Sequence, residues 1–298
     1  SFAALLGTPK HGRPILRPAS EVRLTARDYR KHSPILETRF ETDAGAVTLI
    51  DFMPPRGDNS DVVRLVRGDS GRVRMTMELV LRFDYGLVVP WVSRLADRTW
   101  RAIAGPDMAV LQTPVPLKGK ALTTVAEFDV AAGDIVPFVM TYGPSHKPPP
   151  KPIDPIASLR STEAFWDEWS SHAAADGDWN DAVQRSLMVL KTLIYSPTGG
   201  IVAAPTTSLP EQLGGARNWD YRFCWLRDAT LTLLALMNAG YREEAKAWRD
   251  WLLRAAAGLP SQLQIMYGVA GERQLREWEV VWLPGYEGSK PVRVGNAA

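Results

Sequence analysis

The sequence predicts a multi-domain chain, β then α: an antiparallel β-sandwich followed by the first helices of a helical toroid. Three observations indicate this. Apolar and polar side chains alternate with a period of two through much of residues 1–145. A proline-rich stretch follows at residues 146–152. After about residue 158 the apolar period becomes 3.6, which is typical of helices.

The strands of the first part are read from alternation and from turn residues between the runs. Arg72–Asp84 alternates most regularly and predicts one half-buried strand. Other strands are expected at residues 36–41, 47–53, 62–66, 122–130 and 135–142. Asp69-Ser70-Gly71 is interpreted as a turn between two strands, and Ala132-Gly133-Asp134 as the turn of a late strand pair. Many short antiparallel strands favour a sandwich over residues 1–145.

The second part is predicted to be helical. Residues 146–178 form a linker with one helix, because prolines favour an extended, semi-rigid chain. A helix is expected over Asn180–Tyr195, capped by Asp178 or Asn180. Ala229–Ala239 is apolar nearly all round, so burial on all sides is expected. The amphipathic stretch Arg242–Ala257 follows, and such an inner–outer pair is the unit of a toroid.

Composition narrows the classes of function. Of 298 residues, 45% are hydrophobic and 23% charged, which is ordinary for a globular protein. The net charge of +2 favours neither nucleic acid nor a membrane as a partner. The single cysteine, Cys224, excludes an internal disulfide and favours a reducing, cytoplasmic location. It has no His or Lys neighbours, so it is interpreted as a small hydrophobic residue and not as a nucleophile.

The two ends of the chain suggest a piece of a longer protein. Ser1 takes the place of an initiator Met, and Ala298 falls inside a patterned segment. We therefore expect truncation at both ends, with room for a targeting segment before residue 1. The toroid is expected to be incomplete over residues 179–298.

Chemistry is concentrated in the stretch Tyr221–Asp228, which reads YRFCWLRD. One interpretation is structural: Asp228 caps the helix, and Arg222 or Arg227 pairs with Asp220. The other is sugar binding. Aromatic rings pack on the apolar faces of sugars, and an Arg–Asp pair offers donors and acceptors to neighbouring hydroxyls. The density of aromatic residues favours the second interpretation.

This stretch resembles the first substrate-contact region of the family 15 glycoside hydrolases, the glucoamylases, glucodextranases and related trehalases. Tyr221, Trp225, Arg227 and Asp228 match the pattern aromatic–x–x–x–Trp–x–Arg–Asp. The resemblance implies an (α/α)6 toroid and a bacterial, inverting α-glucosidase acting on an α-glucan or on α,α-trehalose. It also implies that Arg227 and Asp228 hold the 4- and 6-hydroxyls of the terminal glucose. No cofactor is implied.

A second stretch, residues 285–297, resembles another substrate-contact region of the same family. Its density of Gly and Pro predicts a loop. We expect Tyr286, Lys290, Arg293 and Asn296 to contact substrate around the first two subsites. For Lys290 a solvated loop with structural ion pairs is an equal alternative.

Catalytic residues are not assigned. Inversion needs an acid and a base about 6.5–9.5 Å apart. Glu272, Glu277, Glu279 and Glu287 lie near the right loops, but the resemblance implies an acid and a base beyond residue 298. Glu277 and Glu279 are interpreted as rim residues or salt-bridge partners. We expect the 298-residue chain alone not to hydrolyse maltose or trehalose, and no metal-ligand cluster is predicted.

Two other functions stay open at this stage. A disaccharide phosphorylase also joins a sandwich to a toroid, and it uses phosphate in place of the activated water. A non-catalytic carbohydrate-binding protein would explain both the many aromatic residues and the missing acid and base. The oligomeric state is not indicated by the sequence.

Overall fold

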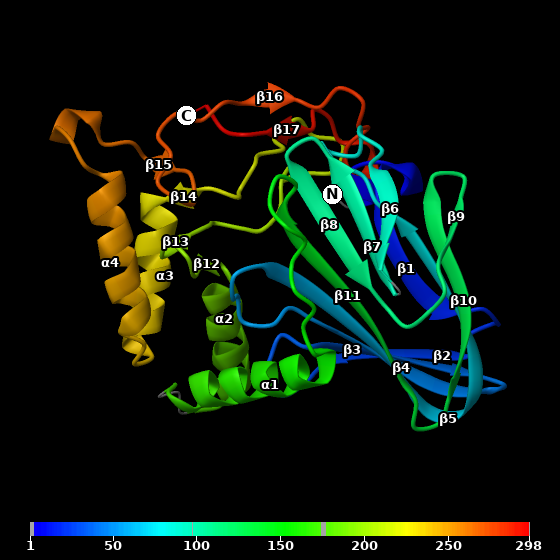
Figure 1. The fold of residues 1–298 in the computed structure, drawn as a ribbon. Helices are drawn as coiled ribbons and strands as arrows, with labels where there is room; N and C mark the ends of the chain where they lie inside the picture. The colour runs from blue at the N-terminus through cyan, green and yellow to red at the C-terminus, as the bar shows by residue number, and fades with distance from the viewer. Residues whose placement is uncertain (1–2, 97, 174–176, 298) are drawn as a thin grey trace. The chain divides into compact units, whose positions relative to one another are not determined.

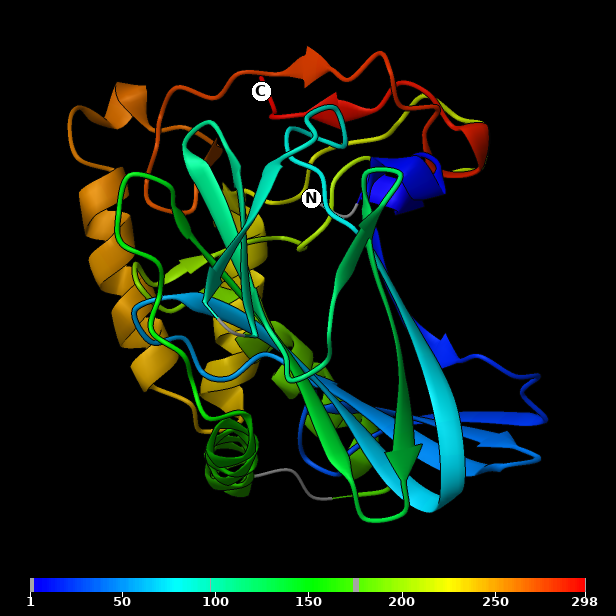
Figure 2. The same cartoon turned by 45° about the vertical axis from the view of Figure 1, so that its right-hand side comes forward.

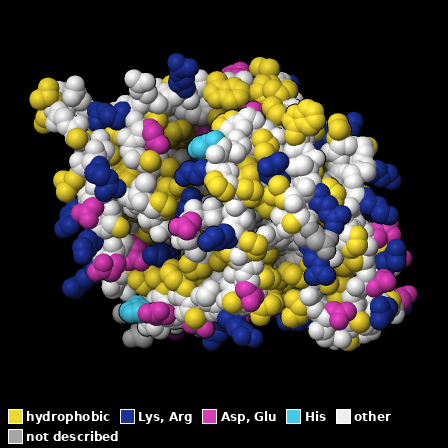
Figure 3. Space-filling view, viewed as in Figure 1, with side chains coloured by type: hydrophobic (Ala, Val, Ile, Leu, Met, Phe, Trp, Pro, Cys, Tyr) yellow, Lys and Arg dark blue, Asp and Glu magenta, His cyan; other side chains and the backbone are white. Residues whose placement is uncertain are grey.

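The computed structural model describes residues 3–96, 98–173 and 177–297. The chain forms two compact units. The first, called the β unit, contains Thr8–Trp166 with residues 1–4, and the second, called the helical unit, contains Asp167–Ala298 with Leu5–Gly7 (Figure 1). On the face shown in Figure 3, basic and acidic side chains are intermingled, in keeping with the small net charge.

The β unit is built on one hydrogen-bonded network of eleven strands. Along its main path the order is β2-β3-β4-β5-β11-β8-β7-β6, while β1 and β10 pair with β5, and β9 pairs with β10. The elements are η1 (Ala3–Leu5), η2 (Pro9–His11), β1 (Arg13–Pro18), β2 (Leu24–Tyr29), β3 (Leu36–Thr42), β4 (Gly45–Phe52), β5 (Ser60–Val80), β6 (Trp91–Ala96), β7 (Thr99–Ala104), β8 (Asp107–Gln112), β9 (Lys118–Lys120), β10 (Thr123–Ala131) and β11 (Ile135–Pro144).

Strand β5 runs through both layers of the β unit. Its first half pairs with β4 and β11, and its second half with β1 and β10. The predicted turn at Asp69-Ser70-Gly71 is therefore wrong, because these residues form a bulge within a continuous strand. Gly71 adopts a positive φ of 65°, and the next amide, Arg72 N, donates to Ala44 O at 3.0 Å. The strand bends there and passes from one layer to the other.

The predicted late pair is also partly wrong. The turn at Ala132-Gly133-Asp134 is present, with Asp134 N donating to Ala131 O at 3.0 Å. However, β10 pairs with the second half of β5 and β11 with the first half, in place of a pairing between them in the described strands. The chain thus crosses between the layers at this turn, opposite the bulge, where Gly68 N donates to Asp134 O at 2.9 Å.

The core of the β unit lies between the two layers (Figure 2). Val66 and Phe138 come from one layer, and Met75 and Val130 from the other, all within one buried cluster. The reverse face of the first layer packs against helix α1 (Pro155–Ser171). There Ile50, Phe52, Val63, Leu65 and Val139 meet Ile153, Ile156 and Leu159.

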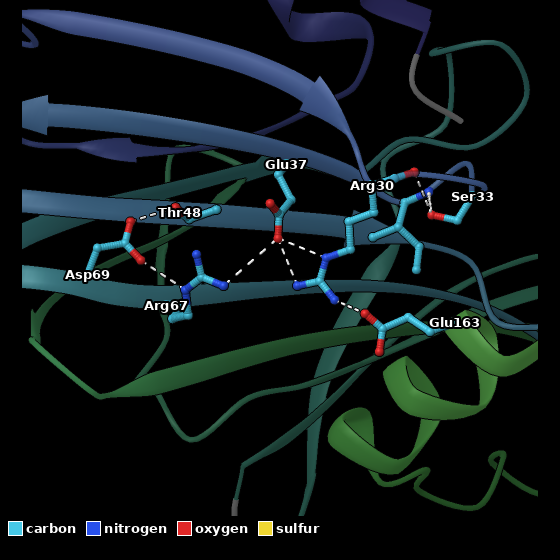
Figure 4. Close-up of polar contacts among 8 residues, drawn as sticks. Arg30, Ser33, Glu37, Thr48, Arg67, Asp69 and Glu163 are labelled. Atoms are coloured by element: carbon cyan, nitrogen blue, oxygen red, sulfur yellow. Dashed lines mark hydrogen bonds and ion pairs between the residues drawn. The ribbon is translucent and has the colours of Figure 1, made fainter. Parts of the chain in front are cut away.

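A polar network also joins α1 to this layer (Figure 4). Arg30 pairs with Glu37 at 2.7 Å and with Glu163 of α1. Arg67 pairs with Asp69 at 2.9 Å and approaches Glu37 at 3.9 Å. Arg30 thus links Glu37 of β3 to Glu163 of α1 and adds a polar contact to the apolar packing between the helix and the layer.

We expect substitution of Gly71 by Ala to destabilise the β unit strongly. A Cβ there would lie 2.1 Å from Ala44 O, in addition to the cost of a left-handed φ. The free energy of unfolding should fall by about 3 kcal/mol. Gly133→Ala is the matched control, because φ is +88° and nothing lies within 4 Å of the added Cβ. It should cost only about 1 kcal/mol. Equal losses in urea denaturation would contradict this account of the bulge.

The helical unit contains the end of α1 and the three further helices expected from the sequence. Its elements are α2 (Asn180–Thr192), β12 (Ile194–Tyr195), β13 (Gly200–Ile201), β14 (Cys224–Trp225), α3 (Leu226–Asn238), α4 (Glu243–Ala255), η3 (Pro260–Gln262), β15 (Met266–Tyr267), β16 (Trp278–Glu279), η4 (Tyr286–Gly288) and β17 (Arg293–Val294). Within the described residues no helix is long and apolar enough to span a membrane. The predicted cap of α2 by Asp178 or Asn180 is wrong, since Trp179 is the N-cap and makes no side-chain cap bond.

Helix α3 is not buried on all sides, contrary to the prediction. Ala229 and Leu236 are buried, and Ala229 packs in one cluster with residues of α4, but Leu231, Leu234 and Met237 are exposed. These three residues recur every third position and so form one stripe on the helix. Nothing among the described residues covers that stripe.

A buried carboxylate joins three helices of this unit. Glu244 of α4 is 7% exposed and accepts hydrogen bonds from Trp169 Nε1 at 2.9 Å and Lys191 Nζ at 2.7 Å. Burial alone would raise the pKa of Glu244, but the hydrogen bonds from Lys191 and Trp169 outweigh it and lower the pKa. The charged form is therefore stabilised in the fold.

We expect Glu244→Gln to reduce the free energy of unfolding at pH 7 by about 1–3 kcal/mol. The folded pKa lies below the unfolded value, so the contribution is complete above the unfolded pKa of about 4.3 and disappears as pH falls through the folded value. The difference between variant and parent should accordingly shrink in acid. Glu243→Gln, at the exposed neighbouring position, should change little at any pH. A pH-independent difference for Glu244→Gln would contradict the assignment.

Candidate functional site

The aromatic residues of the first stretch lie on extended backbone that precedes α3. Residues 203–208 run beside residues 219–223, with Ala204 N donating to Tyr221 O at 3.0 Å and Ser208 N to Trp219 O at 2.9 Å. Trp225 lies in β14, which pairs with β15. The Trp225 ring is 5.9 Å from the Tyr221 ring and 6.4 Å from the Phe223 ring, between centroids. All three rings are partly exposed, so they form an accessible aromatic group.

Arg227 and Asp228 lie in the first turn of α3. Trp225 is the N-cap and makes no side-chain cap bond, so Asp228 does not cap the helix. Its partner is Arg227, whose Nη2 lies 3.0 Å from Asp228 Oδ2. The two side chains are 78% and 36% exposed, which leaves the pair open to a ligand. The first turn also favours a negative charge through the free amides and the helix dipole.

Asp220 holds the two predicted stretches together, a role that the sequence did not indicate. It is 1% exposed. Its carboxylate accepts from Arg222 Nε at 2.9 Å, from Arg222 Nη2 at 2.7 Å and from Gly295 N at 2.9 Å. The Arg222–Asp220 pair considered in the sequence is thus present, whereas Arg227 pairs with Asp228. The spacing of Asp220 and Arg222 fits an Asx turn, and Arg222 N does donate to Oδ1 at 3.1 Å. The contact with Gly295, 75 residues away, has no such local signal.

Arg293 lies against the first stretch. Its guanidinium carbon is 4.7 Å from the centre of the Trp219 ring, and Nη1 donates to Ala216 O at 3.0 Å. Nε lies 3.5 Å from Glu277 Oε1, which confirms Glu277 as a salt-bridge partner. Asn296 follows in the same segment and is buried. These contacts bring the segment of Arg293 and Asn296 beside Trp219 and Asp220.

Tyr286 and Lys290 lie on the loop before this segment. Tyr286 begins η4 and is partly exposed, and Lys290 is exposed. No hydrogen bond or ion pair of either side chain is found within the described residues, so neither is tied to Tyr221 or Asp228. The loop itself is anchored by Ser289, whose Oγ accepts from Gly214 N at 2.8 Å.

Asn218 is a second buried residue that the sequence did not single out. Its Nδ2 donates to Gly215 O and Pro291 O, both at 3.1 Å. Its Oδ1 has no hydrogen-bond partner in the described part of the chain. Together with Asp220, it links the two stretches through backbone groups, a role that residue type and spacing alone do not reveal.

Cys224 is buried and free. Burial raises the pKa of its thiol to about 12, with a smaller contribution from Glu272. The thiol is therefore protonated at neutral pH and is not a nucleophile. Among the residues that the structure describes, no three His, Cys, Asp or Glu side chains are grouped as metal ligands.

Comparison with known proteins points to the same family as the motif in Tyr221–Asp228. Residues 177–298 match the family model Glycosyl hydrolases family 15. The chain is 32% identical to a trehalase of Thermoplasma acidophilum, covering 100% of this chain and 52% of the relative. It is 34% identical to a trehalase of Mycolicibacterium smegmatis, covering 92% of this chain and 45% of the relative. The chain therefore spans about half the length of the curated relatives it matches.

Two solved structures share the fold over most of this chain. The fold matches a bacterial glucoamylase complexed with acarbose with a TM-score of 0.59 at 12% identity, over 88% of this chain and 47% of the other. It matches a putative kojibiose phosphorylase from human microbiome with a TM-score of 0.53 at 11% identity, over 87% and 42%. Identities this low show the fold alone. Residues 177–298 thus match glycosyl hydrolases family 15, the chain as a whole is similar to trehalases, and it shares the fold of a bacterial glucoamylase.

Proposed function

We propose that this chain carries the glucose-recognition part of an inverting trehalase. The accessible pair of Arg227 and Asp228, next to the Tyr221–Trp225 rings, is the observation that carries the proposal. A rigid aromatic surface beside a charged donor–acceptor pair suits a sugar ring with fixed hydroxyls. Trehalose is favoured over α-glucans because the curated relatives compared above are trehalases.

In this proposal the roles divide between the two stretches. Arg227 and Asp228 bind the 4- and 6-hydroxyls of one glucose, and Trp225 packs on its face. Tyr221 lies toward the scissile bond. Tyr286, Lys290, Arg293 and Asn296 line the first two subsites. For Arg293 the contacts with Trp219 and Glu277 hold the side chain in place, so it acts through a fixed guanidinium.

The bond is cut by two carboxyl groups that we place outside residues 1–298. A general acid protonates the glycosidic oxygen, and a general base takes a proton from the water that attacks C1 from the opposite face. Two of the four glutamates near these loops are otherwise engaged: Glu277 pairs with Arg293, and Glu272 Oε2 accepts from Ala270 N at 3.0 Å. The domain division is likewise proposed as a β domain over 1–145, a linker over 146–178 and the toroid from 179.

The test is a hydrolysis panel with the full-length natural protein on trehalose, maltose, maltotriose and isomaltose. We expect a preference for trehalose. NMR of the freshly released product should show one β-glucose and one α-glucose per bond cut, because inversion changes only the attacked anomeric carbon. Residues 1–298 alone should show no turnover. Two α-glucoses, or turnover by residues 1–298, would contradict the proposed mechanism or the placement of the carboxylates.

The same panel tests a phosphorylase, for which the fold match offers support. A phosphorylase would release glucose 1-phosphate only when inorganic phosphate is present. We expect glucose as the sole sugar product with or without phosphate.

A further inference from the structure

The β unit contains a cavity of about 340 Å³ between its two layers. Leu16, Met77 and Leu79 line it from one layer, and Leu111, Phe138 and Met140 from the other. The strand registers place these residues together, since Leu16 lies opposite Met77 and Met140 lies opposite Leu111. The cavity is thus walled by the inner faces of both layers and belongs wholly to the β unit.

Three charged residues also line this apolar cavity, and one of them, Glu78, pairs with Arg13 at 2.7 Å. Leu49 and Val66 belong to the inner core, so Asp51 and Arg64, two positions along the same strands, also face inward. Arg64 Nε lies 2.7 Å from Asp51 Oδ1, and Nη2 lies 3.1 Å from Oδ2. The side chains are 22% and 26% exposed, which indicates that the pair lies where the cavity meets solvent. Arg64 Nη1 has no hydrogen-bond partner among the described residues.

Neither an empty space nor water fits this cavity well. Protein interiors contain few voids larger than one water molecule, and large ones destabilise the fold. A water occupies about 30 Å³ and needs two to four polar partners, so roughly ten waters would fill the space. Apart from the Asp51–Arg64 pair and Glu78, which is bound to Arg13, the walls are hydrocarbon. A ligand that is mainly hydrocarbon and carries one polar group would match both the apolar walls and the charged pair.

We propose that this cavity binds a neutral, mainly apolar small molecule with one oxygen that accepts a hydrogen bond from Arg64 Nη1. The Asp51–Arg64 pair has no net charge and Glu78 is neutralised by Arg13, so an ionic ligand would bury an uncompensated charge. An engineered cavity of about 150 Å³ holds benzene, so a space twice as large suits a molecule of about two fused rings. The site is independent of the glucose-recognition residues, all of which lie in the helical unit.

The test uses 1-naphthol and naphthalene as probes with the natural protein labelled as [13C-methyl]methionine. We expect saturable shifts of the Met77 and Met140 methyl signals, and none for Met188 or Met266 in the helical unit. 1-Naphthol should bind about fivefold more tightly than naphthalene through the added hydrogen bond. No saturable shift at Met77 and Met140, equal affinity of the two probes, or shifts at all four methionines would overturn the proposal.

A pair of double variants isolates the role of the charged pair. Asp51→Leu with Arg64→Met removes both charges together, so neither partner is left unpaired. This double variant should lose the fivefold preference for 1-naphthol but still bind naphthalene. Glu127→Leu with Arg74→Met is the control. It removes an ion pair of the same 2.7 Å separation between β5 and β10, exposed and away from the cavity lining. The control should keep the preference. Loss of the preference for 1-naphthol in both double variants would overturn the role of Arg64. Unchanged positions of the Met188 and Met266 signals report that each variant is folded.

Discussion

Asp228→Asn in the full-length enzyme should lower kcat/KM for trehalose by roughly two to three orders of magnitude, or about 3–4 kcal/mol of transition-state stabilisation. The amide keeps the shape of the side chain but removes the charge that pairs with Arg227 and that, in the proposed role, accepts from the sugar hydroxyls. Interactions that strengthen in the transition state are then lost. The measurement is steady-state kinetics of glucose release.

The chain offers a matched control on the next helix. Arg249 and Asp250 of α4 are also adjacent in sequence, paired at 2.8 Å and exposed. Asp250→Asn removes the same kind of pair outside the candidate site, so kcat/KM should stay within about twofold. Both variants should unfold within about 1 kcal/mol of the parent, since exposed ion pairs contribute little to stability. An unchanged kcat/KM for Asp228→Asn, or an equal loss for Asp250→Asn, would rule out the assigned role.

The sequence predicted those parts of the fold that depend on local periodicity. The alternation in Arg72–Asp84 and the 3.6 period in Arg242–Ala257 correspond to the second half of β5 and to α4. Glycine in Asp69-Ser70-Gly71 indicated a break but not its kind, because a positive φ serves a turn and a bulge equally. Whether the strand continues was decided by hydrogen bonds to Ala44 and to β10, which are distant in the sequence.

Burial in the helical unit was harder to predict for the same reason. An apolar composition indicated that the helix beginning at Leu226 would be covered, but it could not indicate by what. In the described structure one side packs on α4 while Leu231, Leu234 and Met237 are exposed. The candidate site shows the same division. Tyr221 and Asp228 were found by a motif of adjacent residues, whereas Asp220 and Asn218 matter through contacts with Gly295 and Pro291.

Asp220→Asn should reduce the stability of the helical unit as well as activity, unlike Asp228→Asn. Asn can accept with one atom only. Either Gly295 N and Arg222 Nη2, which share Oδ2, or Arg222 N and Nε, which share Oδ1, therefore lose their acceptor. Removing one partner of a buried ion pair costs about 3–5 kcal/mol, and the partial exposure of Arg222 places the expected loss near the lower value. We therefore expect a fall of about 3 kcal/mol in the free energy of unfolding of this unit.

The measurement that separates the two aspartates is hydrogen exchange at the Gly295 amide, read by mass spectrometry of the peptide containing it. Asp220→Asn should speed exchange at this amide and in the Arg293–Asn296 segment, because the neutral side chain either turns its nitrogen towards Gly295 N or accepts from it through a weaker bond. Asp228→Asn should leave exchange there unchanged while it abolishes most activity. If Gly295 stays protected in Asp220→Asn, other contacts such as those of Asn218 and Arg293 hold the two stretches together, and Asp220 is not the positioning residue assigned here.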